Sequence, residues 1–229
     1  MRVLAAVITA TCVSALQAAD IEGTLVIKRR LTRPSVTASV GPYQRGAAVP
    51  LATDAAGDPL AFERTHVAVW LEGDLPTAPA TASMQQKDRS FVPDLVIVPA
   101  GSTVSFPNGD TVFHNVFSLS KPKSFDLGNY PRGQTRVVSF PKPGIVFVNC
   151  RLHPNMTGVI VVTPNKWRAR GDSAGHFTLH DVPPGTYTVV AWHKTAGYYR
   201  TTARVTAEAG ATVEFLIPLS ADGSPMARR

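Results

Sequence analysis

The residues with the clearest chemical potential lie close together, at 150–156. Cys150 is followed three residues later by His153, and Met156 follows three residues after that. A thiolate, an imidazole and a thioether form a soft ligand set, which suits copper better than zinc, magnesium or calcium. His114, 36 residues before Cys150, offers a second imidazole. The spacing therefore predicts a metal site made of His114, Cys150, His153 and a weak axial Met156.

Each of these side chains also has an ordinary structural interpretation. His114 could be a hydrogen-bonded core histidine, Cys150 a small buried hydrophobe and Met156 a filler of the core. Taken singly, each of these alternatives is a common situation in a folded domain. The placement of all the ligand types around the end of one strand favours the metal site.

The elements that could position these ligands are short strands. Runs rich in Val, Ile, Thr and Phe recur between turn residues, at 21–27, 66–71, 95–98, 103–106, 112–117, 135–140, 146–149, 158–162, 176–179, 186–192, 201–207 and 212–217. No window of about a dozen residues keeps a helical apolar period. Many short strands separated by Gly and Pro turns are typical of β-sandwiches and barrels. We predict an all-β chain, in which strand 112–117 carries His114 to the end of the strand that precedes Cys150.

The segment from about 91 to 163 resembles the type 1 (blue) copper proteins of the plastocyanin and amicyanin kind. The likeness rests on VPAGSTVSFPN at 98–108, on HNVF at 114–117 and on the loop at 150–156. The short gap from His153 to Met156 is more similar to amicyanin. The resemblance implies a cupredoxin Greek-key β-sandwich with one type 1 copper per chain, bound by the four residues named above. It also implies a hydrogen bond from Asn115 near the cysteine loop that holds the site rigid.

The resemblance further implies how such a protein meets its partners. In these relatives the second histidine reaches the surface through an apolar patch where partners dock. Phe113, Leu152 and Pro154 are the corresponding candidates here, and Arg151 and Lys142 would add a basic rim. We therefore expect a redox partner protein, either a dehydrogenase or a cytochrome.

A second resemblance lies outside that segment. Residues 171–190 are similar to the carboxypeptidase regulatory-like β-sandwich module, which opens with strands like 21–26 and 67–73. We therefore predict a cupredoxin domain (86–164) inserted into a second β-sandwich (20–85 and 165–219), with a flexible tail (220–229). The alternative is a cupredoxin between two unrelated extensions. The resemblance implies no peptidase activity, because the chain has no His-Glu-x-x-His run and no Ser-His-Asp spacing.

The first 19 residues have the order of a secretory signal peptide. Arg2 precedes an apolar stretch at 3–16, and small residues lead up to Ala19. We expect export to the periplasm and no stable membrane insertion afterwards, since no later segment is apolar enough to span a bilayer. Cys12 would leave with the signal, so Cys150 would remain unpaired in a compartment where cysteines usually form disulfides. Ligation of a metal would account for that.

Charge and histidine spacing exclude some functions. The net charge is +7, but the basic residues are scattered, which argues against a nucleic acid partner. The chain has no His-x-His pair from which a trinuclear copper cluster could be built, which argues against a multicopper oxidase. We expect a non-enzymatic electron carrier with one copper ion. A copper delivery protein and a non-redox binding module that docks on a larger complex remain as alternatives.

Overall fold

Strands from both ends of the chain form one β-sandwich in the computed structural model, which describes residues 17–32 and 58–218. One sheet has the order β14-β1-β17 and the other β13-β2-β15-β16. Their bounds are β1 Ala19–Ile27, β2 Val67–Leu71, β13 Arg168–Arg170, β14 His176–Val182, β15 Gly185–His193, β16 Gly197–Val205 and β17 Ala211–Ile217. β1 pairs antiparallel with β14 and parallel with β17. We call this unit the flanking sandwich.

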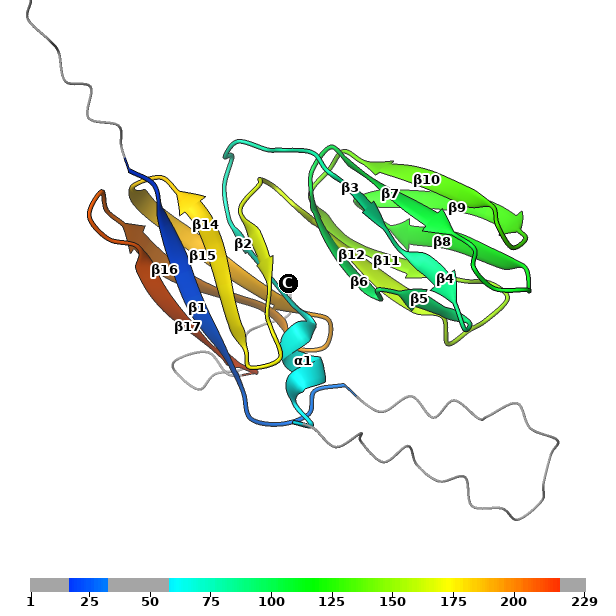
Figure 1. The fold of residues 1–229 in the computed structure, drawn as a ribbon, viewed down its shortest axis with the longest axis horizontal. Helices are drawn as coiled ribbons and strands as arrows, with labels where there is room; N and C mark the ends of the chain where they lie inside the picture. The colour runs from blue at the N-terminus through cyan, green and yellow to red at the C-terminus, as the bar shows by residue number, and fades with distance from the viewer. Residues whose placement is uncertain (1–16, 33–57, 219–229) are drawn as a thin grey trace, which may run out of the picture.

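The intervening strands form a second sandwich, which we call the inserted sandwich (residues 81–163; Figure 1). Its sheets have the orders β10-β7-β3 and β6-β12-β11-β8-β9, and β4 and β5 form a hairpin. The bounds are β3 Thr81–Ser83, β4 Gln85–Lys87, β5 Ser90–Val92, β6 Leu95–Pro99, β7 Ser102–Pro107, β8 His114–Ser120, β9 Lys123–Tyr130, β10 Thr135–Phe140, β11 Gly144–Asn149 and β12 Thr157–Thr163.

The all-β prediction is confirmed, with one short helix, α1 (Ala61–Thr65), among the described residues. That part of the chain holds no helix that is long and apolar enough to cross a membrane. The predicted boundary between residues 85 and 86 is wrong, because β3 pairs with β7 and so belongs to the inserted sandwich. The Ala- and Pro-rich stretch before β3 carries no strand pattern that would have shown this. Residues 1–16 of the predicted signal peptide, residue 219 and the predicted tail (220–229) lie outside the described residues.

Two strands owe their unbroken apolar sequences to burial on both faces. In β2, Val67, Val69 and Leu71 point into the core of the flanking sandwich. Ala68 and Trp70 point the other way, into a separate apolar cluster. In β12, side chains alternate in the same manner between the core of the inserted sandwich and that cluster. The cluster is Ala68, Trp70, Leu95, Val159, Val161, Val190 and Trp192, and it forms the junction of the two sandwiches. Burial on both faces explains why alternation with polar residues is absent.

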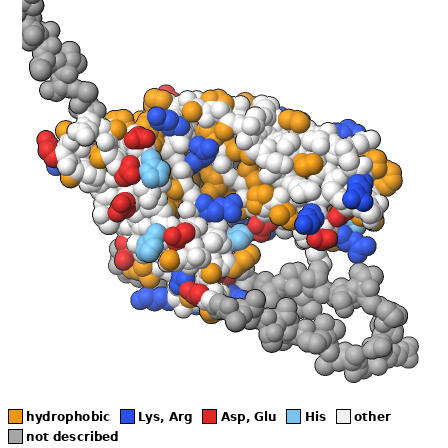
Figure 2. Space-filling view, in the orientation of Figure 1, with side chains coloured by type: hydrophobic (Ala, Val, Ile, Leu, Met, Phe, Trp, Pro, Cys, Tyr) orange, Lys and Arg blue, Asp and Glu red, His pale blue; other side chains and the backbone are white. Residues whose placement is uncertain are grey.

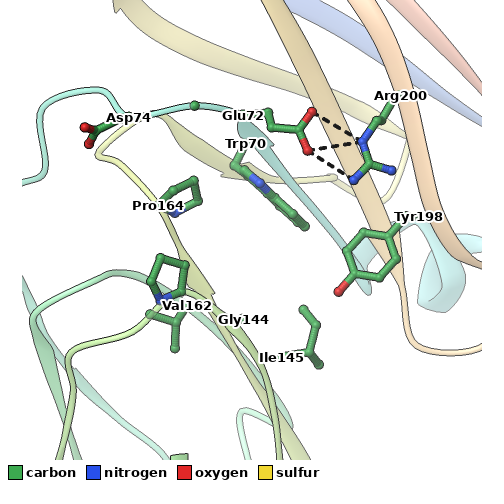
Figure 3. Close-up of a pocket in the computed structure, with 11 residues that line it drawn as sticks. Trp70, Glu72, Asp74, Gly144, Ile145, Val162, Pro164, Tyr198 and Arg200 are labelled. Atoms are coloured by element: carbon green, nitrogen blue, oxygen red, sulfur yellow. Dashed lines mark hydrogen bonds and ion pairs between the residues drawn. The ribbon is translucent and has the colours of Figure 1, made fainter. Parts of the chain in front are cut away.

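A crevice of about 550 Å³ opens at one end of this junction (Figure 3). Trp70 and Tyr198 line it from the flanking sandwich, with their rings 6.3 Å apart and nearly perpendicular. Glu72 accepts hydrogen bonds from Arg200 at 3.1 and 3.2 Å. Ile145 and its neighbours on the inserted sandwich form the opposite wall. The crevice marks the end of the junction where the chain passes between the two units.

Candidate metal centre

Three of the predicted ligands meet at one end of the inserted sandwich. His114 begins β8, Cys150 follows β11, and His153 lies in the loop before β12. Cys150 Sγ lies 3.9 Å from His114 Nδ1 and 3.6 Å from His153 Nδ1. One ligand atom from each residue fits within 4.8 Å of the others. Among residues 17–32 and 58–218, this is the one group of three or more His, Cys, Asp or Glu side chains that could hold a metal ion together.

The pairing of β8 with β11 closes the 36-residue gap between His114 and Cys150. Asn149 lies opposite Phe117, which places Cys150 beside the start of β8. The backbone N–H of Asn115 donates a hydrogen bond to Cys150 Sγ at 3.4 Å. β8 and β9 also shift register between Asn115 and Phe117. The sulfur is thus held by the backbone of the strand that carries the first histidine, and Cys150 is buried.

The loop from Cys150 to Met156 is closed by its own backbone. Cys150 N–H donates to the carbonyl of Met156 at 3.2 Å, and Met156 N–H donates to the carbonyl of His153 at 2.9 Å. The Met156 side chain is 1% exposed and packs in the core of the inserted sandwich. Met156 is therefore fixed in the same tight loop as the two ligands before it.

Asn115 links the site to the neighbouring strand. Its side-chain amide donates to Asp126 Oδ1 at 2.7 Å, and Arg151 donates to Asp126 Oδ2 at 2.9 Å. The guanidinium of Arg151 also lies over the ring of Phe117, 4.8 Å from its centre. Hydrogen bonds from Gly128 N–H and from Asn115 lower the pKa of Asp126. Asn115 thus restrains Cys150 through its backbone and β9 through its side chain.

Asp110 is the residue of this site that sequence reasoning missed. Its Oδ2 lies 2.7 Å from Nε2 of His114, and its own N–H donates to Asn108 Oδ1 at 2.9 Å. Burial raises the pKa of Asp110, but hydrogen bonds from Arg89 N–H, His114 and Asp88 N–H outweigh it and lower the pKa. The sequence signal was the Pro-Asn-Gly-Asp turn at 107–110, which ends four residues before His114.

The surface next to the site is partly apolar. Phe113 is 56% exposed and Leu152 is 46% exposed, as the apolar patch requires. A groove of about 850 Å³ runs beside Leu152, between the β4–β5 turn and the loop that holds His153. Burial lowers the pKa of His153, with smaller contributions from His114 and Arg89. On the face that Figure 2 shows, basic and acidic side chains are interspersed.

The predicted basic rim is half wrong. Lys142 precedes Gly144, which starts β11, whereas Cys150 follows the other end of that strand. Lys142 therefore lies at the far end of the inserted sandwich, next to residues that line the crevice. Arg151 is close to the site but is engaged by Asp126 at 2.9 Å. Arg89, on the β4–β5 turn, is an arginine whose charge lowers the pKa of His153.

The other histidines lie beside carboxylates away from the site. His66 Nε2 lies 2.9 Å from Asp94 Oδ1, a contact that joins the two sandwiches. His193 is fully buried and lies 3.1 Å from the equally buried Glu63. Sequence reasoning missed this pair, because Glu63 stands on the short helix α1. His176 and His180 are exposed and lie beside Asp172 and Asp20.

Comparisons with known proteins match separate parts of the chain. Residues 163–215 match the family model described as polysaccharide lyase family 4, domain II. This match covers the region that resembles the carboxypeptidase regulatory-like module, under a different family description. No curated protein matches the chain.

Solved structures that are similar to the chain include a copper-containing nitrite reductase, a purple cupredoxin and an amicyanin. A copper-containing nitrite reductase from Thermus scotoductus SA-01 is 27% identical, with a TM-score of 0.36, over 39% of this chain and 24% of the enzyme. A purple cupredoxin from Nitrosopumilus maritimus is 23% identical, with a TM-score of 0.33, over 36% of this chain and 99% of its own. Amicyanin from Paracoccus versutus is 22% identical, with a TM-score of 0.34, over 41% of this chain and 96% of its own.

Proposed function

We propose that the chain is an exported electron carrier, with one type 1 copper site formed by His114, Cys150, His153 and Met156. The observation that carries the proposal is the convergence of Cys150 Sγ and the Nδ1 atoms of both histidines within 4.8 Å. Copper bound there would supply one-electron exchange between Cu(II) and Cu(I). A thiolate with two imidazoles is the ligand set of such sites, and Met156, buried in the same loop, would supply the thioether for the weak axial position.

The residues present suit that ion in two further respects. Nε2 of His114 is occupied by Asp110, so Nδ1, the nitrogen that faces Cys150, is the one left for a metal. Cys150 and His114 are both buried, which keeps water from the thiol and the imidazole. An electron carrier benefits from ligands that move little between redox states. The hydrogen bonds that close residues 150–156, and that from Asn115 to Cys150, provide this restraint.

The test of this proposal is an absorption spectrum with metal analysis. We expect one copper per chain and an intense blue band from cysteine-to-Cu(II) charge transfer. Cys150→Ser and His153→Gln should lose the band. His180→Gln is the matched control, since His180 is exposed and lies on the flanking sandwich. Stoichiometric zinc without copper affinity, or a band that persists in Cys150→Ser, would overturn the proposal.

The cellular setting of the proposed carrier follows from the sequence. Export to the periplasm, a carboxypeptidase regulatory-like identity for the flanking sandwich, and a dehydrogenase or cytochrome as partner belong to the same proposal. The exposed Phe113 and Leu152 support a protein partner at the surface next to the proposed copper site. Fractionation of cells that produce the full chain tests the export. Retention of the intact chain in the cytoplasm would refute this part alone.

A copper delivery role is the second candidate. The groove beside His153 favours it, because it gives a partner access to one ligand. A delivery protein would hold Cu(I) chiefly through its soft ligands, Cys150 and Met156. Cu(I) competition with a chelator of known affinity, run beside a redox titration, separates the two functions. Reversible oxidation and reduction without loss of metal supports the carrier, and transfer of copper on mixing with the chelator supports delivery.

A further inference from the structure

Asp110 contacts the least accessible part of the proposed copper site. The His114 side chain is 0% exposed, and the Asp110 side chain is 13% exposed. The 2.7 Å separation between Asp110 Oδ2 and His114 Nε2 is that of a strong, charge-assisted hydrogen bond. Because a carboxylate accepts hydrogen bonds, this contact places the imidazole proton on Nε2. In the neutral imidazole Nδ1 then carries the free electron pair, and this nitrogen faces Cys150 Sγ at 3.9 Å.

Other hydrogen bonds fix the position of the carboxylate itself. Asp110 Oδ1 accepts from Asp88 N–H at 2.7 Å, and Oδ2 accepts from Arg89 N–H at 2.9 Å. Asp88 and Arg89 form the turn of the β4–β5 hairpin, with φ of 52° and 56°. This left-handed conformation is uncommon for residues other than glycine, so the turn depends on contacts that hold it. The carboxylate therefore bridges the hairpin turn and the buried histidine.

We propose that Asp110 is a positioning residue of the metal centre, which fixes the orientation and tautomer of His114 and increases the electron donation of its Nδ1. The inference rests on the proposed copper-binding function. A carboxylate on the second nitrogen of a ligating imidazole makes that imidazole a stronger donor, and removal of such a partner typically costs about 10–100-fold in metal affinity. A negative charge next to a ligating histidine also stabilises Cu(II) relative to Cu(I). Asp110 thus lowers the reduction potential.

The same contacts suggest a path by which a bound partner acts on the site. The turn that donates to Asp110 also lines the groove beside His153. A molecule that displaces this turn would disturb the carboxylate and, through it, His114. A partner that contacts the turn is therefore expected to change the reduction potential without touching a ligand.

The decisive variant is Asp110→Asn, with Asp88→Asn as its matched control. The asparagine side chain in the first variant keeps the size of the aspartate but has one acceptor oxygen for three donors, and it removes the negative charge beside His114. Asp88 is exposed on the same turn and bonds Asp110 only through its backbone N–H, which the control retains. Asparagine also tolerates the left-handed conformation of this position. The control removes an equal charge nearby without breaking the contact to His114.

Two readouts are needed, one with copper and one without. In the copper-loaded protein, Asp110→Asn should raise the reduction potential and weaken Cu(II) affinity by about 10–100-fold, and Asp88→Asn should change both much less. In the metal-free wild type, nitrogen-15 NMR of the imidazole should show His114 protonated on Nε2. That measurement needs no variant to fold and no copper to bind, so it tests Asp110 even if the proposed function fails. Equal potentials in the two variants, or a neutral His114 whose single ring proton lies on Nδ1, would overturn the inference.

Discussion

The contact between His66 and Asp94 joins the two sandwiches, and its contribution to stability should depend on pH. His66 Nε2 lies 2.9 Å from Asp94 Oδ1, with the side chains 19% and 47% exposed. Burial lowers the pKa of His66, but hydrogen bonds to Asp94 and to the Phe62 carbonyl outweigh it and raise the pKa. Burial raises the pKa of Asp94, but the hydrogen bond to His66 outweighs it and lowers the pKa.

The direction of each shift sets the pH range. A raised histidine pKa gives stability that is fully present below the ordinary value of 6.5 and is lost as pH rises through the folded pKa. A lowered aspartate pKa gives stability that is present above the ordinary value of 3.8 and is lost as pH falls through the folded pKa. The pair therefore stabilises the folded chain most between these two ordinary values.

The expected size is modest because Asp94 is nearly half exposed to solvent. Screening keeps such a pair at about 0.5–1 kcal/mol. Since 1 kcal/mol corresponds to about 2–4 °C in a chain of this length, Asp94→Asn should lower Tm by about 1–4 °C near pH 5.5. The difference from wild type should shrink at alkaline pH, once the pH has risen through the folded pKa of His66. Asp20→Asn is the control, since it removes a carboxylate beside the exposed His180 within one sandwich.

Differential scanning calorimetry at both pH values measures these differences directly. His66→Asn and the double variant complete a mutant cycle that isolates the pair from its surroundings. An equal loss at the two pH values would refute the reasoning, and so would additive effects of the two substitutions.

Three further predictions concern the axial ligand, the junction and the flanking sandwich. Met156→Leu should keep the blue band and raise the reduction potential, as redox titration would show, because an apolar side chain of similar volume replaces a weak donor. Trp192→Ala should lower the free energy of urea unfolding by about 3–5 kcal/mol, since Trp192 is buried in the junction. Gly23→Ala should cost about 1–3 kcal/mol in the same assay, because its Cβ would overlap the ring of Phe177 on β14. A Met156→Leu protein that loses its colour, or wild-type stability in either of the other variants, would contradict the corresponding prediction.

The sequence predicted the site where its information was local. Cys150, His153 and Met156 fall within one loop, so their types and spacing alone indicate a soft metal site. His114 required one further step, the expectation that its strand lies beside the strand before Cys150. The pairing of β8 with β11 bears out that step. All-β architecture was equally accessible, because period-2 runs and turn residues recur along the chain.

What the sequence did not reveal depends on contacts between distant segments. Asp110 accepts hydrogen bonds from the β4–β5 turn, which lies 21 and 22 residues before it in the sequence. That turn has left-handed backbone conformations that the residue types of Asp88 and Arg89 do not predict. The burial of Glu63 against His193 depends on a five-residue helix, too short for a periodic pattern. The junction between the two sandwiches could have been predicted from the sequence. The unbroken apolar runs in β2 and β12 are typical of strands buried on both faces, but they were interpreted only as strands.

The inserted sandwich is attached so that the end with the candidate metal centre stays accessible. The chain enters through residues 72–80 and leaves through residues 164–167, and these connections are joined by a hydrogen bond from Lys166 N–H to the Pro76 carbonyl at 3.1 Å. Both lie where β12 ends, whereas the loop at 150–156 precedes the start of β12. The flanking sandwich packs along the side of β12, where Lys194 reaches Thr157 at 3.4 Å. It can therefore stabilise the strand that follows Met156 while Leu152 stays exposed to a partner.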